Sequence, residues 1–215
     1  MPESPSSGST RTGRRVGERR FVSRAGDKLE HALDAFDLAV GGMRCADFGC
    51  NVGGFTDCLL QRDAASVIAI DTGYGVLAWK LRSDDRVTVM ERTNALHAPA
   101  PPDPVDLVVI DLAWTPQRLA LPVAREWLAD DGRVVTLVKP HYELPEERKH
   151  LLEGGFLPQE LAPGVLAETL DAMDELGFRV LDSTQSPLVG GKSSRKRGVP
   201  GNIEFLALLE PIPTR

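Results

Sequence analysis

Long apolar runs are missing from this sequence of 215 residues. None approaches the roughly 18–20 residues that a helix needs to cross a lipid bilayer, which excludes a membrane-spanning helix of ordinary type. The polar N-terminus also lacks the apolar segment of a secretory signal peptide. We therefore expect a cytoplasmic protein that does not act in a membrane.

Cysteine and histidine are scarce as well. The three cysteines, Cys45, Cys50 and Cys58, form no C-x-x-C pair and are odd in number. This pattern favours packing residues in a reducing compartment over a redox or metal site. The four histidines lack the spacing of zinc ligands, so we expect no metal.

The net charge of −6 speaks against nucleic-acid binding, but the positive charges are unevenly distributed. One interpretation is two solvated flexible segments, and the other is two arms that bind phosphates. Charge alone leaves both open. The basic clusters are Arg11, Arg14, Arg15, Arg19 and Arg20 near the start, and Lys192, Arg195, Lys196 and Arg197 near the end.

The chain divides into a short tail and one large domain. Residues 1–20 are rich in Ser, Gly, Pro and Arg without periodicity, which predicts a disordered basic tail. In residues 21–215, apolar runs alternate with helical patterns, which predicts an α/β fold with a mostly parallel sheet and helices on both faces. The predicted strands are 43–48, 66–70, 87–90, 105–110, 133–138, 178–181 and 203–209; the predicted helices are 26–38, 55–62, 76–81, 116–129 and 164–176.

A glycine-rich turn joins the first predicted strand to the next helix. It runs from Asp47 to Phe55 and contains Gly49, Gly53 and Gly54. Glycines in such a turn let a ligand approach the backbone near a helix N-terminus. A nicotinamide fingerprint would read G-x-G-x-x-G, and this spacing differs from it.

A second acid lies at the end of the next predicted strand. Asp71 closes the next strand, where a carboxylate can accept both ribose hydroxyls of a nucleoside cofactor. Asp47 could face the ammonium group of a cofactor with an amino-acid end, and S-adenosylmethionine is such a cofactor. The alternative is a plain strand–turn–helix without a ligand.

Four polar residues lie at the edges of predicted strands or next to them. Asp111 and Lys139 each end an apolar run, Glu204 opens one, and Lys28 follows a polar segment. Groups at the carboxyl ends of parallel strands line the ligand crevice of an open α/β sheet. Two lysines and two acids gathered there predict a proton-transfer site, whereas each residue alone would be an ordinary strand-end residue.

Several long sequence motifs match one known family, in the same order along the chain. They are FVSRAGDKL (21–29), GGFTDCLLQR (53–62), YGVLAWKL (74–81), MERTN (90–94), VKP (138–140) and GNIEF (201–205). On these motifs the chain resembles the FtsJ-like RNA methyltransferases, most closely the catalytic domain of the TlyA-type hemolysin/rRNA methyltransferases. The resemblance covers roughly residues 21–210.

The resemblance implies a Rossmann-like methyltransferase fold with S-adenosylmethionine as the methyl donor, and an RNA substrate, in particular rRNA or a ribosomal particle. It also implies a Lys-Asp-Lys-Glu tetrad for methylation of the ribose 2'-hydroxyl, which falls on Lys28, Asp111, Lys139 and Glu204. The family's cofactor positions fall on Gly49, Gly53, Phe55 and Asp71, with Asn94 near the adenine-side polar residue and Asp111 at the boundary of both sites.

The departures from the family cluster on the substrate side. TlyA-type proteins carry an N-terminal S4-like RNA-binding module, where this chain has about twenty Arg-rich residues. The sequences that follow Asp111 and Lys139-Pro140 also differ from those of the family. Trp114 could stack on a base or serve in packing. The candidate RNA-binding residues are Arg24, Trp114, Lys192, Arg195, Lys196 and Arg197.

The tetrad suggests a specific chemistry. A ribose hydroxyl is a poor nucleophile near neutral pH, and methyl transfer requires it to be aligned with the donor carbon. We expect Lys139 to accept or direct its proton, Lys28 to supply a neighbouring positive charge, and Asp111 and Glu204 to hold the lysines. Two other hypotheses stay open: a cofactor-binding interaction protein, hemolysin-like or regulatory, and a nicotinamide dehydrogenase, which the glycine spacing disfavours.

Overall fold

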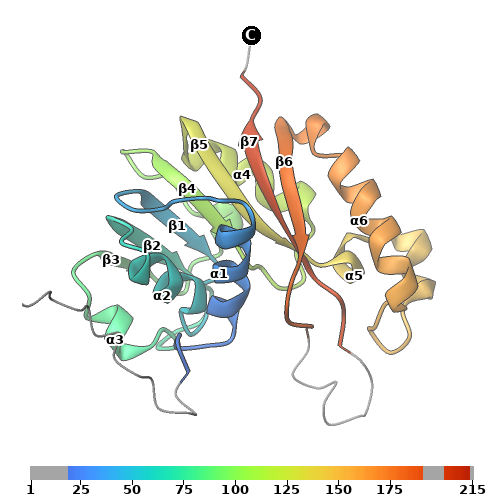
Figure 1. The fold of residues 1–215 in the computed structure, drawn as a ribbon, viewed down its shortest axis with the longest axis horizontal. Helices are drawn as coiled ribbons and strands as arrows, with labels where there is room; N and C mark the ends of the chain where they lie inside the picture. Colours follow the sequence, from blue (N-terminus) through green and yellow to red (C-terminus); the bar gives the residue numbers. More distant parts are fainter. Residues whose placement is uncertain (1–18, 191–200, 214–215) are drawn as a thin grey trace, which may run out of the picture.

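The computed structural model describes residues 19–190 and 201–213. Within them a seven-stranded sheet has the order β3-β2-β1-β4-β5-β7-β6 (Figure 1). Strands β1 to β5 are all parallel, so their carboxyl ends lie along the same edge of the sheet. The strands are β1 (Arg44–Phe48), β2 (Ser66–Ile70), β3 (Val87–Met90), β4 (Val105–Ile110), β5 (Leu128–Val138), β6 (Phe178–Gln185) and β7 (Phe205–Pro211).

Strand β7 runs antiparallel to both of its neighbours, β5 and β6. Its first residue, Phe205, pairs with Val138, the last residue of β5. The start of β7 therefore lies at the edge where the parallel strands end. This reversal brings Glu204, which precedes β7, next to Lys139, which follows β5.

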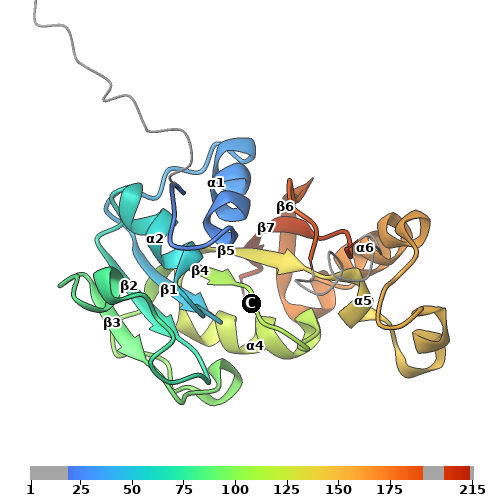
Figure 2. The same cartoon turned by 90° about the horizontal axis from the view of Figure 1, so that it is seen from below.

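Helices cover both faces of the sheet, as predicted (Figure 2). Figure 2 shows α1 and α2 on one side of the strands and α4 on the other. The helices are α1 (Ala25–Ala35), α2 (Gly54–Gln61), α3 (Trp79–Arg82), α4 (Gln117–Trp127), α5 (Pro140–Glu143) and α6 (Ala162–Asp171), with 3-10 turns η1 (Ala95–His97), η2 (Glu146–Leu151), η3 (Gln159–Leu161) and η4 (Asp174–Leu176).

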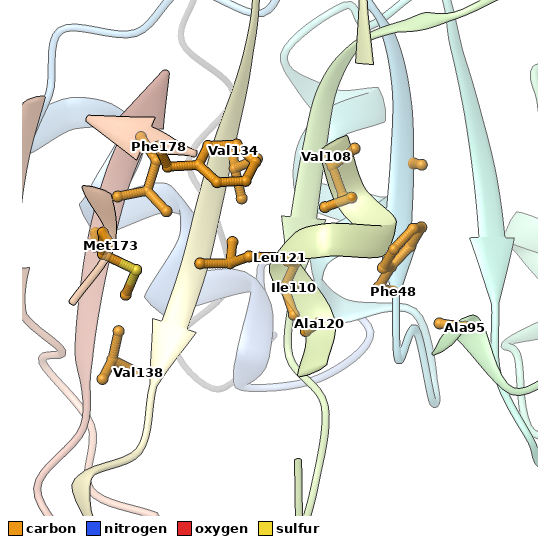
Figure 3. Packing of buried hydrophobic residues seen from close by; sticks show 14 of the residues in the cluster. Phe48, Ala95, Val108, Ile110, Ala120, Leu121, Val134, Val138, Met173 and Phe178 are labelled. Atoms are coloured by element: carbon orange, nitrogen blue, oxygen red, sulfur yellow. The ribbon is translucent and has the colours of Figure 1, made fainter. Parts of the chain in front are cut away.

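The central strands are buried on both faces because alternate residues enter two different cores. In β4, Leu107 and Val109 pack with α1 and α2, while Val108 and Ile110 pack with α4. Figure 3 shows Ile110 beside Ala120 and Leu121 of α4. This two-sided packing explains why β4 reads in the sequence as an unbroken apolar run.

The predicted elements are confirmed, with differences mainly at their ends. Strands β2, β3 and β4 have the predicted bounds, whereas β5 and β6 extend into polar residues that apolar patterning does not mark. Helix α3 is shorter than predicted, and α5 was not predicted. No helix among the described residues is long and apolar enough to cross a membrane.

Candidate active site

A hollow lies where the strand order reverses, between β1 and β4. In open α/β sheets ligands bind at this switch point, outside the carboxyl ends of the strands. Two cavities of about 230 and 420 Å³ meet there, and both are lined by Gly49, Asn51, Asp111 and Ala113. Because they share these walls, they form two ends of one cleft.

Gly49 is the residue that lets the turns after β1 and β4 approach each other. Its backbone has a φ of +89°, a region that favours glycine. A Cβ placed on Gly49 would lie 2.7 Å from the carbonyl oxygen of Asp111, which no real side chain tolerates. Gly49 thus forms part of the cleft wall, and its contact with a ligand stays a prediction.

Gly53 and Gly54 line neither of these two cavities. A Cβ on Gly53 would collide with Leu81, and one on Gly54 with Ser23. Both glycines thus allow the start of α2 to pack closely against neighbouring segments. Phe55, the next residue, does line the smaller cavity.

Asp47 is a fully buried carboxylate in β1 that lines the smaller cavity. Its Oδ2 accepts hydrogen bonds from the amide and the hydroxyl of Thr56, at 2.9 and 2.7 Å. Its Oδ1 has no partner among the described residues. Burial, with Asp111 and Asp71 nearby, raises the pKa of Asp47 to about 7. An orphaned buried acceptor of this kind fits a ligand that brings a donor or a positive charge.

The larger cavity contains the second predicted acid. Asp71 accepts backbone hydrogen bonds from Asn51 at 2.9 Å and from Gly73 at 2.7 Å, one on each carboxylate oxygen. Each oxygen keeps a further lone pair for a hydroxyl group. Asn94 also lines this cavity; its Oδ1 caps η1 by accepting from the amide of Leu96, which leaves the amide nitrogen for a ligand.

The four tetrad residues come together as two ion pairs. Lys139 Nζ lies 2.6 Å from Asp111 Oδ1, and Lys28 pairs with Glu204. Lys28, Asp111 and Lys139 line the smaller cavity together. Lys28, Lys139 and Glu204 are buried, and Asp111 is half-buried. Lys28 lies in the first turn of α1, within the predicted helix 26–38, and reaches the strand ends from there.

One aromatic residue, Tyr142, stands beside Lys139, and a second, Trp114, stands beside Tyr142. Trp114 has a φ of +60° and is 83% exposed, and its ring centroid lies 5.2 Å from that of Tyr142. The Tyr142 ring in turn lies 5.9 Å from Lys139 Nζ. An exposed aromatic side chain on a strained backbone is costly, which speaks against a role in packing. Arg24 lines the same cavity as Lys139.

The basic residues Lys192, Arg195, Lys196 and Arg197 lie outside the described residues, as do Arg11, Arg14 and Arg15. The two ends of the segment 191–200 are described, however. The amide of Gly190 donates to the carbonyl of Asn202 at 2.8 Å, and the amide of Ser186 donates to the carbonyl of Glu204 at 2.8 Å. The described residues that flank the segment on both sides therefore lie beside Glu204.

Several residues of the site were missed from the sequence. Asn51 lines both cavities with a φ of +50°, and Asn in a glycine-rich turn is a usable signal for such a backbone. Outside the two cavities, Asp57 is buried and binds Lys80 at 2.9 Å, a contact that local sequence does not reveal. Trp79, predicted to lie in the core, is 78% exposed.

The sheet order and the position of the cleft are those of the Rossmann-like fold found in S-adenosylmethionine-dependent methyltransferases. The structure of such an enzyme from Mesorhizobium loti has the same fold, with a TM-score of 0.58, 18% identity, and coverage of 83% of this chain and 95% of that chain. A hemolysin-like protein from Streptococcus thermophilus is more similar, with a TM-score of 0.82, 37% identity, and coverage of 93% and 70%.

A model of the FtsJ-like methyltransferase family matches residues 21–198, and the chain belongs to this family. Among its relatives, the 16S/23S rRNA (cytidine-2'-O)-methyltransferase TlyA of Mycobacterium tuberculosis is 44% identical over 196 residues, which are 89% of this chain and 69% of that protein. Hemolysin A of Brachyspira hyodysenteriae is 35% identical over 192 residues, 87% of this chain and 76% of that protein.

Proposed function

We propose that this protein transfers a methyl group from S-adenosylmethionine to a ribose 2'-hydroxyl of RNA, with rRNA as the substrate class. The observation that carries the proposal is the pair of buried ion pairs, Lys139–Asp111 and Lys28–Glu204, beside a cleft at the switch point. The related TlyA enzyme, which by its name methylates cytidine 2'-oxygens in rRNA, supports the choice of substrate.

The residues of the cleft fit the donor from end to end. Asp71 and Asn94 in the larger cavity would hold the ribose and the adenine side. Asp47 in the smaller cavity would face the ammonium group, since its Oδ1 is otherwise without a partner. When bound, S-adenosylmethionine supplies an electrophilic methyl group on a positively charged sulfur.

The tetrad would then prepare the nucleophile. Lys139 is held by two acceptors, Asp111 Oδ1 at 2.6 Å and the Leu112 carbonyl at 2.8 Å, and so has a fixed position at the cleft wall. From there it would orient the hydroxyl and accept or relay its proton. Glu204 would offset the charge of Lys28, and Asp111 that of Lys139, so that two lysines can share one buried site.

The RNA would reach the tetrad across a basic and aromatic rim. Trp114 would stack on a base, and Arg24 would bind phosphate. The cluster Lys192, Arg195, Lys196 and Arg197 belongs to the segment whose described flanking residues lie beside Glu204, and it would add phosphate contacts. Such an enzyme would act in the cytoplasm, where its RNA is found.

Ribose methylation can be mapped directly. RNA from cells with and without this protein should differ in 2'-O-methylation at defined rRNA positions. In vitro, the purified protein should transfer labelled methyl groups to rRNA or to ribosomal particles from the deleted cells, and Lys139→Ala should not. A protein that binds S-adenosylmethionine but changes no ribose in either experiment would instead support the interaction-protein hypothesis.

A further inference from the structure

Glu143 makes a long-range contact that the proposed chemistry does not use. It is the last residue of α5, the short helix that begins directly after Lys139. Its carboxylate oxygens lie 3.1 and 3.2 Å from the backbone nitrogen of Gln117, which is 26 residues away in sequence. Gln117 is the first residue of α4. Glu143 therefore joins the segment after β5 to the segment after β4.

The contact is a helix cap supplied by a distant residue. The first amides of a helix have no partner within the helix, and here the N-cap residue, Pro116, provides no side-chain acceptor. A carboxylate at this end also interacts favourably with the helix dipole. Burial nevertheless raises the pKa of Glu143 to about 7, so the carboxylate is held there at an electrostatic cost.

The same two segments meet at two further points closer to the cleft. Lys139 Nζ donates to the carbonyl of Leu112, and the Trp114 and Tyr142 rings contact each other. Leu112 and Trp114 lie between Asp111 and α4, and Tyr142 lies between Lys139 and Glu143. The two segments are thus joined by a row of contacts, here called the ladder. It runs from the Lys139–Asp111 pair at the cleft, through the Trp114–Tyr142 rings, to the contact between Glu143 and Gln117.

We propose that Glu143 is a positioning residue that fixes the Trp114 segment relative to Lys139, and so aligns the RNA nucleotide with the attacking geometry. The proposal rests on the proposed function, because it assigns to this ladder the alignment of an RNA substrate. Glu143 touches neither cavity of the cleft and acts through α4 and α5. Small displacements of positioning groups away from the chemistry are known to be costly to rate.

The first experiment compares Glu143→Ala with Glu143→Gln. A glutamine can still accept the Gln117 amide through its side-chain oxygen, and an alanine cannot. Glu143→Ala should lower kcat on RNA by about 10–100-fold, leave the Kd for S-adenosylmethionine unchanged, and be largely rescued in Glu143→Gln. Glu168→Ala is the matched control. Glu168 and Glu143 both line a groove between α4 and α6, but Glu168 pairs with Arg148 on the surface.

The second experiment removes the other partner, in case Glu143→Ala does not fold. Proline is tolerated at the first position of a helix, so Gln117→Pro deletes the donor amide while α4 is retained. Gln117→Ala keeps the amide but loses the same side-chain hydrogen bonds to Thr136 and Leu137. Gln117→Pro should be slower than Gln117→Ala by about 10–100-fold. Where Glu143→Ala folds, adding it to Gln117→Pro should slow that variant no further, because the contact is already lost.

Hydrogen exchange separates a failure of this inference from a failure of the proposed function. Amides in 112–115 and in the first turn of α4 should exchange faster in Glu143→Ala or Gln117→Pro than in their controls, whether or not RNA is methylated. If the wild-type protein methylates no RNA, the proposed function and the alignment role both fail, and exchange still reports whether the ladder exists. Normal kcat in Glu143→Ala, or equal rates in Gln117→Pro and Gln117→Ala, would overturn the inference.

Discussion

Lys139 and Asp111 follow neighbouring parallel strands, and the lysine nitrogen lies 2.6 Å from Asp111 Oδ1. The same nitrogen donates to the carbonyl of Leu112 at 2.8 Å. Two acceptors therefore set the position of the ammonium group before any ligand arrives. A planar guanidinium at this position would present its donors in a different geometry and could not release a proton near neutral pH.

Replacement of Lys139 should separate chemistry from cofactor binding. Lys139→Arg and Lys139→Ala should both slow methyl transfer to RNA by about 10²–10⁴-fold, because a general base is lost. Calorimetry should find S-adenosylmethionine bound with normal affinity in both. Near-normal turnover of Lys139→Arg would mean that Lys139 supplies charge only.

The control for this experiment is Lys149→Ala. Lys149 is largely exposed and pairs with Glu146 one helical turn away, and such surface pairs contribute little to stability. Lys80 is a poor control, because it binds the buried carboxylate of Asp57.

Asp71→Ala should weaken binding of S-adenosylmethionine without removing the fold. Two hydrogen bonds to the cofactor ribose would be lost, each worth about 1.5–3 kcal/mol when charge-assisted. Titration calorimetry measures the change, and thermal unfolding tests whether losing the contacts to Asn51 and Gly73 disturbs the turn. Asp103→Ala, at an exposed residue, is the control. Unchanged affinity in folded Asp71→Ala would remove Asp71 from the cofactor site.

Asp47 should make the stability of the protein depend on pH. Its native pKa of about 7 is higher than the ordinary value of 3.8, so the native state binds the proton more tightly than the unfolded state. The contribution of Asp47 is therefore fully present below about pH 4 and is lost as pH rises toward 7, with a slope of at most about 1.4 kcal/mol per pH unit.

Urea unfolding of the wild type and of Asp47→Asn between pH 4 and 8 measures this effect. The difference in unfolding free energy between the two should shift in favour of Asp47→Asn as the pH rises, because asparagine does not titrate. Glu143, whose pKa is also raised, is present in both proteins and cancels. A difference that stays constant with pH would show that Asp47 is ionised throughout.

The basic segments should control the salt dependence of RNA binding. Deleting residues 1–18, or replacing Lys192, Arg195, Lys196 and Arg197 with glutamine, should flatten the plot of log affinity against log salt, by about 0.7 per lost phosphate contact on single strands. The deletion should stop before Arg20, whose guanidinium pairs with Glu30. Slopes equal to that of the full chain would show that the segments are solvated and bind no RNA.

The sequence predicted best where local pattern and tertiary role coincide. Strands β2, β3 and β4 were predicted at their bounds, and for β2 and β4 the cause is an apolar run that both cores bury. Asp47 and Asp71 were predicted as a pair from a glycine-rich turn and a strand-end acid, and both line the cleft. Their partners, Thr56 and Asn51, became evident only in the structure.

The sequence predicted least where distant segments decide the outcome. Lys28 lies in the predicted helix 26–38, but its pairing with Glu204 depends on α1 packing against α2 beside the sheet, which no local pattern shows. Trp79 lies within an apolar stretch of sequence but is exposed, since α3 has one turn and buries Leu81 instead. Glu143 gave no local signal, because its partner is 26 residues away and is a backbone amide.

The two halves of the sheet have different proposed roles, with the reversed strand β7 in the second half. The groups proposed to hold the methyl donor come from residues 47–94, whereas Lys139, Glu204 and the basic segment come from β5 onward. The described residues on either side of this segment are joined by the hydrogen bond from Gly190 to Asn202, next to Glu204, and the entropy of loop closure grows only slowly with length. A segment inserted there could therefore be lengthened, shortened or exchanged to accept a different RNA, while the donor half is left untouched.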